Sequence, residues 1–207
     1  MPCLYILTGP NGAGKSTVGP GLLPDSINKA YPPFDGDRLK MIKQQEFKKS
    51  TGSYKEAARL ADEYVYAEFE KLYKKALADN DHFAYEGHFS EESSWDLIRK
   101  FREKGYRVDM IFLGLVSLKL SSDRVFNRAI HGGHNVKPYD IENNYFGNLI
   151  KLNEHLELID QLTILDTSGR IPIHVGQWRN NKMNFNVDDE SIPKWVLRYL
   201  PRLFNSG

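Results

Sequence analysis

Short apolar runs that stop at glycine or proline alternate with longer amphipathic stretches along most of this chain. Such runs are typical of strands buried in a parallel sheet, whereas apolar residues that recur every three to four positions indicate helices. The alternation predicts an α/β fold with a mostly parallel sheet, helices on both faces and right-handed crossovers.

The pattern places the individual elements as follows. Strands are expected at residues 3–7, 30–34, 82–86, 107–115, 162–166 and 171–175. Helices are expected at residues 15–23, 38–48, 54–78, 95–103, 118–130, 139–159 and 192–204. Pro32 and Pro33 interrupt the second strand, because proline has no N–H to donate to a sheet. The segment after residue 175 is polar and rich in asparagine, so we expect a main domain at 1–175 and an appendage packed on it at 176–207.

Composition narrows the class of protein. A length of 207 residues suits one domain with a substantial core. Lys plus Arg number 28 and Asp plus Glu number 27, so charge gives no general attraction to nucleic acid or to a membrane. Cys3 is alone and cannot form an internal disulfide. No apolar run approaches the roughly 20 residues of a membrane span. We therefore expect a cytoplasmic protein.

A glycine-rich segment follows the first strand and matches G-x-x-x-x-G-K-[ST] in full. Its residues are Gly9, Pro10, Asn11, Gly12, Ala13, Gly14, Lys15, Ser16 and Thr17. The glycines let backbone N–H groups point at phosphate oxygens, and the following helix presents its positive end to them. Lys15 would reach the β- and γ-phosphates, and the Ser16 hydroxyl would bind Mg²⁺. The motif predicts ATP and Mg²⁺ as cofactors and the three-layer fold of P-loop NTPases and kinases.

Acidic residues follow two of the expected strands, at the edge where open α/β sheets bind ligands. Asp35 and Asp37 come after the second strand, and either could accept the proton of a substrate hydroxyl that attacks the γ-phosphate. An aspartate here could also be the N-cap of the next helix. Glu86 ends the third strand and could contact substrate hydroxyls or hold Mg²⁺ through water, or be a surface acid. His88 is a further substrate-binding candidate, or a solvated loop residue.

Two arginines lie four residues apart in a predicted helix. Arg124 and Arg128 share one face of it, where they could clamp a triphosphate and stabilise the charge that develops during transfer. The alternative is a solvated helix face with local ion pairs. The Gly-Gly-His sequence at 132–134 ends this helix, and the loop to the next helix could act as a lid over the phosphates.

These features together resemble the zeta-toxin family of P-loop kinases, in its compact bacterial branch, over roughly residues 3–170. The resemblance rests on the P-loop, the Asp37 region, Glu86, and two later segments. One of these runs from Arg124 through Gly132-Gly133-His134 and Pro138 to Asn148-Leu149, and the other is Leu165-Asp166-Thr167-Ser168.

Members of that family studied as toxins phosphorylate a sugar hydroxyl of UDP-N-acetylglucosamine. The resemblance implies that Lys15 binds phosphate, that Asp37 is the base, and that Arg124 and Arg128 are transition-state clamps. Glu86 is implied as a contact to substrate or Mg²⁺. Asp35 and His88 stay substrate-binding candidates because of their positions after the strands, and His134 is a further candidate in the Gly-Gly-His segment. A toxin of this kind also implies a small-molecule acceptor and an antitoxin protein as partner.

The chain departs from the family pattern at three places. Asp35-Gly36-Asp37 stands where the branch usually has Asn-x-Asp, and Glu86-Gly87-His88 where it has Glu-Thr-Thr. Asn143 and Asn144 replace two arginines that usually precede the tyrosine of the later helix. The loss of these positive charges weakens the grip on phosphate or changes the substrate.

Two other functions fit the P-loop. One is an ATPase or nucleotide switch with a macromolecular partner, but the apolar run Ile111–Leu115 lacks the acid of a Walker B strand. The other is a polynucleotide 5′-hydroxyl kinase. Its substrate favours a basic, aromatic-rich stretch, which the sequence does not contain. An ATP- and Mg²⁺-dependent small-molecule kinase is the first hypothesis.

Overall fold

The computed structural model describes residues 1–131 and 136–204, in which seven strands form one sheet of order β2-β3-β1-β4-β5-β6-β7. The strands are β1 (Cys3–Thr8), β2 (Phe34–Asp35), β3 (Phe83–Glu86), β4 (Arg107–Gly114), β5 (Gln161–Asp166), β6 (Ile173–Arg179) and β7 (Lys182–Phe185). The first five are parallel, and β6 and β7 are antiparallel. The predicted α/β class with a mostly parallel sheet is confirmed.

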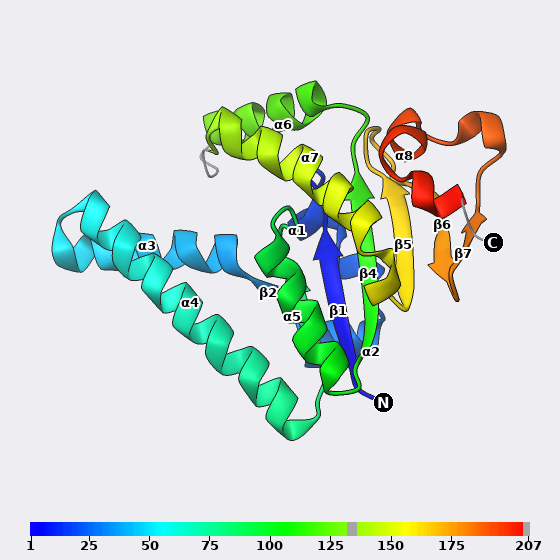
Figure 1. Ribbon diagram of the computed structural model, residues 1–207. Coiled ribbons are helices and arrows are strands. Elements are labelled where there is room, and N and C mark those ends of the chain that lie inside the picture. Colours follow the sequence, from blue (N-terminus) through cyan, green and yellow to red (C-terminus); the bar gives the residue numbers. More distant parts are fainter. Residues whose placement is uncertain (132–135, 205–207) are drawn as a thin grey trace.

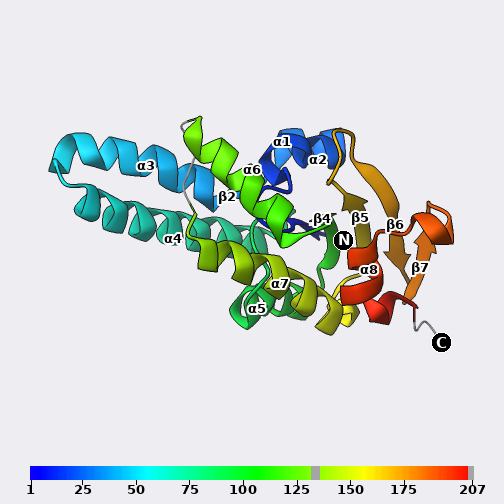
Figure 2. The ribbon, with the colours of Figure 1, turned by 90° about the horizontal axis from the view of Figure 1, so that it is seen from above.

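Helices cover both faces of the sheet (Figures 1 and 2). They are α1 (Lys15–Val18), α2 (Asp25–Ala30), α3 (Gly36–Thr51), α4 (Tyr54–Asp79), α5 (Glu92–Glu103), α6 (Leu118–Ile130), α7 (Pro138–Glu154) and α8 (Lys194–Tyr199), with 3₁₀ turns η1 (Pro20–Leu22), η2 (Leu156–Leu158), η3 (Asp189–Ser191) and η4 (Pro201–Phe204). Figure 2 shows α1 and α2 on one face and α5, α7 and α8 on the other. None of the helices described is both long and apolar enough to cross a membrane.

The central strands are apolar on both faces because helices cover both sides of them. Ile6 in β1, Phe112 in β4 and Ile164 in β5 are fully buried. Parallel pairing brings the carboxyl ends of these strands to one edge of the sheet, where Glu86 of β3 pairs in register with Leu7 of β1. Helix α6 crosses above this edge (Figure 1). The polar residues that follow the strands therefore meet there.

A helical hairpin of α3 and α4 connects β2 with β3 and projects away from the sheet (Figures 1 and 2). Asp35 ends β2 and also caps α3, since its side chain accepts a hydrogen bond from the Arg38 backbone N–H. Ser53 caps α4 in the same manner. The first turn of α3 is thereby held at the carboxyl edge of the sheet.

Several predicted boundaries were wrong. The expected strand at 30–34 is only Phe34–Asp35, because Ala30 still belongs to α2 and two prolines follow. The expected helix at 15–23 is divided into α1 and the η1 turn, and the one expected at 139–159 ends at Glu154. These differences change lengths but not the order of the elements.

The segment after residue 175 continues the sheet, and the predicted boundary at 175/176 falls inside β6. Asn180 and Asn181, with φ of 52° and 58°, form the two-residue turn that joins β6 to β7. In α8, the buried Trp195 donates from Nε1 to Oδ2 of the buried Asp166, at 2.7 Å. The tail therefore shares the core of the preceding residues.

Candidate active site

The P-loop joins β1 to α1 and bends tightly at its glycines. Gly9 has φ 139°, and a Cβ atom there would lie 2.2 Å from the Leu113 carbonyl oxygen of the neighbouring strand. Gly12 has φ 75°, and a Cβ atom there would lie 2.9 Å from Cβ of Arg124. Both positions therefore require glycine, for backbone conformation and for space.

Lys15 is a buried cation at the start of α1. Its Nζ donates to the carbonyl oxygens of Gly9, at 2.8 Å, and Pro10, at 3.1 Å. Burial lowers the pKa of Lys15 to about 8, although the carboxylates of Glu86 and Asp37 act in the opposite direction. An anion brought to this ammonium would favour its charged form. The side chain is therefore suited to hold a phosphate.

One hydroxyl and two carboxylates meet beside Lys15. Ser16 Oγ lies 2.6 Å from Oε1 of Glu86 and 3.2 Å from Oδ2 of Asp35. Burial raises the pKa of Glu86, because water no longer solvates its charge. Oxygen atoms of this kind are the ligands that Mg²⁺ prefers. The three side chains fit a Mg²⁺ ion, which would relieve the crowding of negative charge.

Asp37 lies in the first turn of α3 and is exposed. Because Asp35 provides the cap, Asp37 is not needed for that role. It lines a cavity of about 380 Å³ that spans the P-loop, α3 and α6. The other lining residues are Asn11, Gly12, Gly14, Lys15, Ser16, Thr17, Asp35, Arg38, Met41, Glu86, His88, Arg124 and Arg128. The structure thus brings most of the candidate residues to one cavity.

A smaller cavity of about 230 Å³ adjoins this one and shares five lining residues with it, Lys15, Asp35, Asp37, Glu86 and His88. Its wall includes Tyr85 and Gly87. A Cβ atom on Gly87 would lie 2.5 Å from the Tyr85 ring, so the glycine lets that ring lie beside the loop. The departure from the family pattern at this position therefore shapes the cavity wall.

His88 is held neutral in that wall. Burial lowers its pKa well below the usual value, and Lys15 and Arg128 act in the same direction, against the Gly9 carbonyl. The ring Nε2 lies 3.3 Å from Asn11 Nδ2. The buried Nδ1 has no hydrogen-bond partner among the residues described. His88 lines both cavities, so its neutral imidazole can contact a polar ligand there.

Asparagines link helix α7 to the P-loop, which the sequence did not reveal. Asn144 Nδ2 donates to Asn11 Oδ1 at 2.9 Å, and Ser90 Oγ donates to Asn144 Oδ1 at 2.9 Å. Asn148, buried one turn later, accepts from Thr8 Oγ1 and the Phe89 backbone N–H. Asn144 therefore holds the P-loop through a hydrogen bond between uncharged groups, at a position where the family usually has an arginine.

The two arginines of α6 differ in their surroundings. Arg124 donates to the carbonyl oxygens of Gly12, Thr167, Ser168 and Gly169 at 2.8–3.4 Å, so its guanidinium group joins the P-loop to the loop after β5. Arg128 is exposed and lines the 380 Å³ cavity. No carboxylate or carbonyl holds its guanidinium group within the described part of the chain. The two arginines are equivalent in sequence spacing but differ in exposure and in hydrogen bonding.

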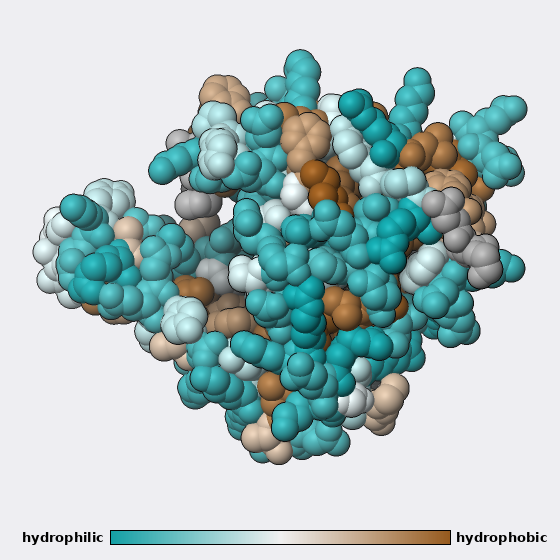
Figure 3. Space-filling view, viewed as in Figure 1, coloured by the Kyte–Doolittle hydropathy of each residue, from teal (hydrophilic) through white to brown (hydrophobic). Residues whose placement is uncertain are grey.

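His134 and the expected lid at 132–135 lie outside the described residues. On either side of them, α6 and α7 face the α3–α4 hairpin across a notch in the surface (Figure 3). The 380 Å³ cavity is lined from both sides of this region, by Met41 of α3 and Arg128 of α6.

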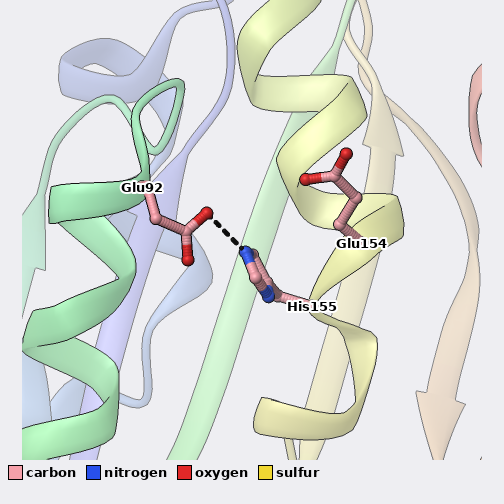
Figure 4. A group of neighbouring side chains, drawn as sticks. All are labelled: Glu92, Glu154 and His155. Carbon is pink, nitrogen blue, oxygen red and sulfur yellow. Dashed lines mark hydrogen bonds and ion pairs between the residues drawn. The ribbon is translucent and has the colours of Figure 1, made fainter.

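A second polar cluster joins the start of α5 to the end of α7 (Figure 4). Glu92, Glu154 and His155 could together offer three ligand atoms to a metal ion. However, Lys151 Nζ lies 2.9 Å from Glu92 and 2.7 Å from Glu154. Lys151, followed by Arg99 and His155, lowers the pKa of Glu92 to about 2. Lys151 and Arg99 supply positive charge that a metal would bring, so the cluster acts as an ion-pair network between helices.

Comparison with protein families places residues 1–177 in the family described as Zeta toxin. The chain belongs to the zeta toxin family. Family membership confirms the resemblance that the sequence motifs indicated, and the complete P-loop fits the phosphates of a nucleotide. A search of curated proteins found no match.

Similar solved structures share the fold at low sequence identity. AvrRxo1-ORF1 in complex with AvrRxo1-ORF2, crystallised with ATP, has a TM-score of 0.64 at 14% identity. The match covers 97% of this chain but 64% of that one, so this chain spans less than two thirds of its length. A protein of the PezAT toxin–antitoxin system of Streptococcus pneumoniae has a TM-score of 0.56 at 18% identity, covering 100% and 87% of the two chains. A candidate kinase from Chloroflexus aurantiacus has a TM-score of 0.56 at 16% identity, covering 97% and 96%.

Proposed function

We propose that the protein transfers the γ-phosphate of ATP to a hydroxyl group of a small polar acceptor, with a nucleotide sugar as the first class to test. The observation that carries this proposal is the pair of adjoining cavities beside Lys15. One contains the P-loop, and the other has room for an acceptor next to Asp37. A kinase needs both sites to meet at the γ-phosphate.

In this proposal the phosphate end of ATP binds along the P-loop and Lys15. The acceptor oxygen forms a bond to the γ-phosphorus while the bond from that phosphorus to the bridging oxygen of ADP breaks. Asp37 accepts the proton of the attacking hydroxyl. Arg128 donates to the phosphoryl oxygens as negative charge redistributes among them. Arg124 positions the P-loop by joining the Gly12 carbonyl to three carbonyl groups of the loop after β5.

Ser16, Asp35 and Glu86 would hold Mg²⁺, directly or through water. When bound, the ion neutralises phosphate charge during transfer. The chain's own contribution is to cluster these oxygens before the nucleotide arrives, with Ser16 Oγ between the two carboxylates. In this proposal Asp35, which the sequence suggested as a substrate contact, is instead a metal ligand.

The acceptor side combines groups that suit a polyhydroxylated molecule with a negative charge. Asp37 and His88 offer hydrogen-bonding groups, and Tyr85 offers an aromatic surface. Arg38 and Arg128 line the larger cavity next to them. A nucleotide sugar meets these requirements, because its hydroxyls would face the carboxylate and its phosphates the arginines.

A protein partner is also part of the proposal. One of the similar structures belongs to a toxin–antitoxin system, and a second was solved as a complex of two proteins. We therefore expect that, if the chain acts as a toxin, an antitoxin protein restrains it in the cell.

The test is to incubate the pure protein with ATP, Mg²⁺ and a panel of nucleotide sugars, and to detect products by mass spectrometry. We expect one acceptor to gain a phosphate, and the product to disappear with Lys15→Ala. An Ala78→Trp protein, altered on the exposed surface of α4, is the matched control. Loss of ATP without any phosphorylated acceptor would favour an ATPase instead.

A further inference from the structure

A third cavity lies at the opposite end of β3 from the phosphate site. It has a volume of about 320 Å³ and lies between the end of α4, the amino end of β3 and the segment that leads from α2 into β2. This volume is at the lower end of the range of small-molecule pockets. None of the functions proposed above uses this cavity.

The local sequence explains why this space is left open. Strand β2 pairs with β3 only at Tyr85 and Glu86, so no strand covers the outer edge of β3 at Phe83 and Ala84. Pro32, just before β2, has no N–H with which to extend that pairing. Small side chains at Ala76 and Ala84 then leave room between the helix and the strand. Apolar walls of this kind favour a flat, apolar ligand.

The mouth of the cavity carries an excess of negative charge. Asp79 and Asp81 both line it, and Lys75 pairs with Asp79 at 2.5 Å. Asp81 instead accepts hydrogen bonds from the Tyr31 hydroxyl and the His82 backbone N–H. The Tyr31 hydroxyl lowers the pKa of Asp81, which keeps the carboxylate ionised at neutral pH.

The end of α4 adds to this charge. The helix has 26 residues and ends at Asp79, with no basic residue in its last turn. The carbonyl end of a helix carries a partial negative charge that a cation usually offsets. Here Lys75 pairs with Asp79, whereas Asp81 has no ion-pair partner among the residues described, so the negative charge at this end is only partly offset.

We propose that this cavity binds a small arylalkylamine, with the aromatic ring between Ala76 and Ala84 and the alkylammonium group at Asp79 and Asp81. The site is separate from the ATP site, since the two cavities share no lining residue. Its walls nevertheless include Phe34, which immediately precedes Asp35, and part of α4, which follows α3. Binding therefore does not depend on the proposed kinase activity, and it takes place against β2 and α4, the two elements that flank α3 in the chain.

The experiment uses tryptamine as the probe. Indole-3-acetate, which has the same ring and the opposite charge, is the control ligand. Backbone amide shifts of ¹⁵N-labelled protein are followed by NMR during titration. We expect tryptamine to shift the amides of Ala76, His82 and Ala84 with a Kd on the order of 1 mM, as suits about twelve non-hydrogen atoms. Indole-3-acetate is expected not to shift these amide signals.

Two variants and two controls sharpen the assignment. Ala30→Trp adds bulk at an exposed lining residue and should abolish the shifts, whereas Ala78→Trp, exposed on α4 but outside the lining, should not. Asp81→Asn keeps the shape and should weaken tryptamine binding about fivefold, the scale of one partly exposed ion pair. Lys15→Ala should bind tryptamine as the native protein does.

Three outcomes would overturn the proposal. Equal binding of indole-3-acetate would show that charge plays no part. Unchanged binding by Ala30→Trp would place the probe elsewhere. Shifts confined to the P-loop amides, lost with Lys15→Ala, would assign tryptamine to the nucleotide site. The amide spectrum itself shows whether each variant is folded, so a misfolded protein cannot be mistaken for a loss of binding.

Discussion

The two ends of β3 differ sharply in character. At the carboxyl end, Glu86 is a buried carboxyl group whose pKa is raised by burial, and His88 is held neutral beside Lys15. At the amino end, Phe83 is buried against the rings of Phe69 and Phe101, and the charged groups stay at the surface. The four residues of β3 thus separate a polar site, whose buried charged groups lower the stability of the fold, from an apolar core.

The difference shows which end is organised for stability and which for chemistry. Buried charge weakens a fold unless it is fully compensated, and such sites persist where function needs them. Substitutions at the carboxyl end should therefore cost activity while leaving stability intact or improved. Substitutions at the amino end should do the reverse.

The largest effect is expected from Asp37→Asn. Without a carboxylate to accept the hydroxyl proton, phosphate transfer should fall about 10³-fold, within the range for a general base. ATP affinity and the thermal midpoint should stay close to native, because Asp37 is exposed and does not cap α3. Single-turnover transfer and calorimetric ATP titration measure the two effects. Asp79→Asn at the other end is the control. A loss of ATP affinity would make Asp37 a nucleotide or metal contact instead.

Phe83→Ala tests the other end. The ring is 7% exposed and stacks on Phe101 with centroids 5.7 Å apart. Its removal should lower the free energy of unfolding by about 3 kcal/mol, as is usual for a large aromatic in a core. Urea titration measures this loss. Under conditions where the variant is folded, kcat should match the native value, and a lower kcat would mean that both ends serve catalysis.

The next effect separates Arg124 from Arg128. Arg128→Ala should lower kcat about 30-fold with little change in KM for ATP or in stability, since the side chain is exposed and acts only in transfer. Arg124→Ala should raise KM for ATP and lower stability by about 2 kcal/mol, because four carbonyl groups lose a charged donor. Arg124→Lys should restore part of that stability. Identical behaviour of the two alanine variants would contradict the division of roles.

Local motifs made much of this site predictable. The P-loop is nine consecutive residues, so one short stretch of sequence is enough to predict its conformation. The meeting of Asp35, Glu86 and Ser16 followed from the rule that parallel strands end at one edge. The roles of Arg124 and Asn144 could not be foreseen, because their partners lie 43 to 133 residues away.

The tail teaches a different lesson. Its polar, asparagine-rich composition suggested an appendage, yet β6 and β7 extend the sheet. The sequence does indicate this hairpin, because two asparagines between strands of alternating apolar and polar residues favour a tight turn with positive φ. The turn residues, and not the polar composition, determine the structure of this segment. The tertiary bond from Trp195 to Asp166, by contrast, left no local trace in the sequence.

The smallest expected effect is a gain in stability from Glu86→Gln. Burial raises the pKa of Glu86 in the folded state, so folding favours its protonated form. The contribution of that group is fully favourable below the unfolded pKa and is lost as pH rises through the folded pKa. Glutamine has no charge to bury and its oxygen can still accept from Ser16. We therefore expect the variant to be about 1 kcal/mol more stable than native at pH 8. The difference should shrink toward pH 4, as measured by urea unfolding at both pH values. A variant that is less stable at pH 8 would show that the ionised carboxylate holds the site together, and the contrast between the two ends of β3 would then fail at its carboxyl end.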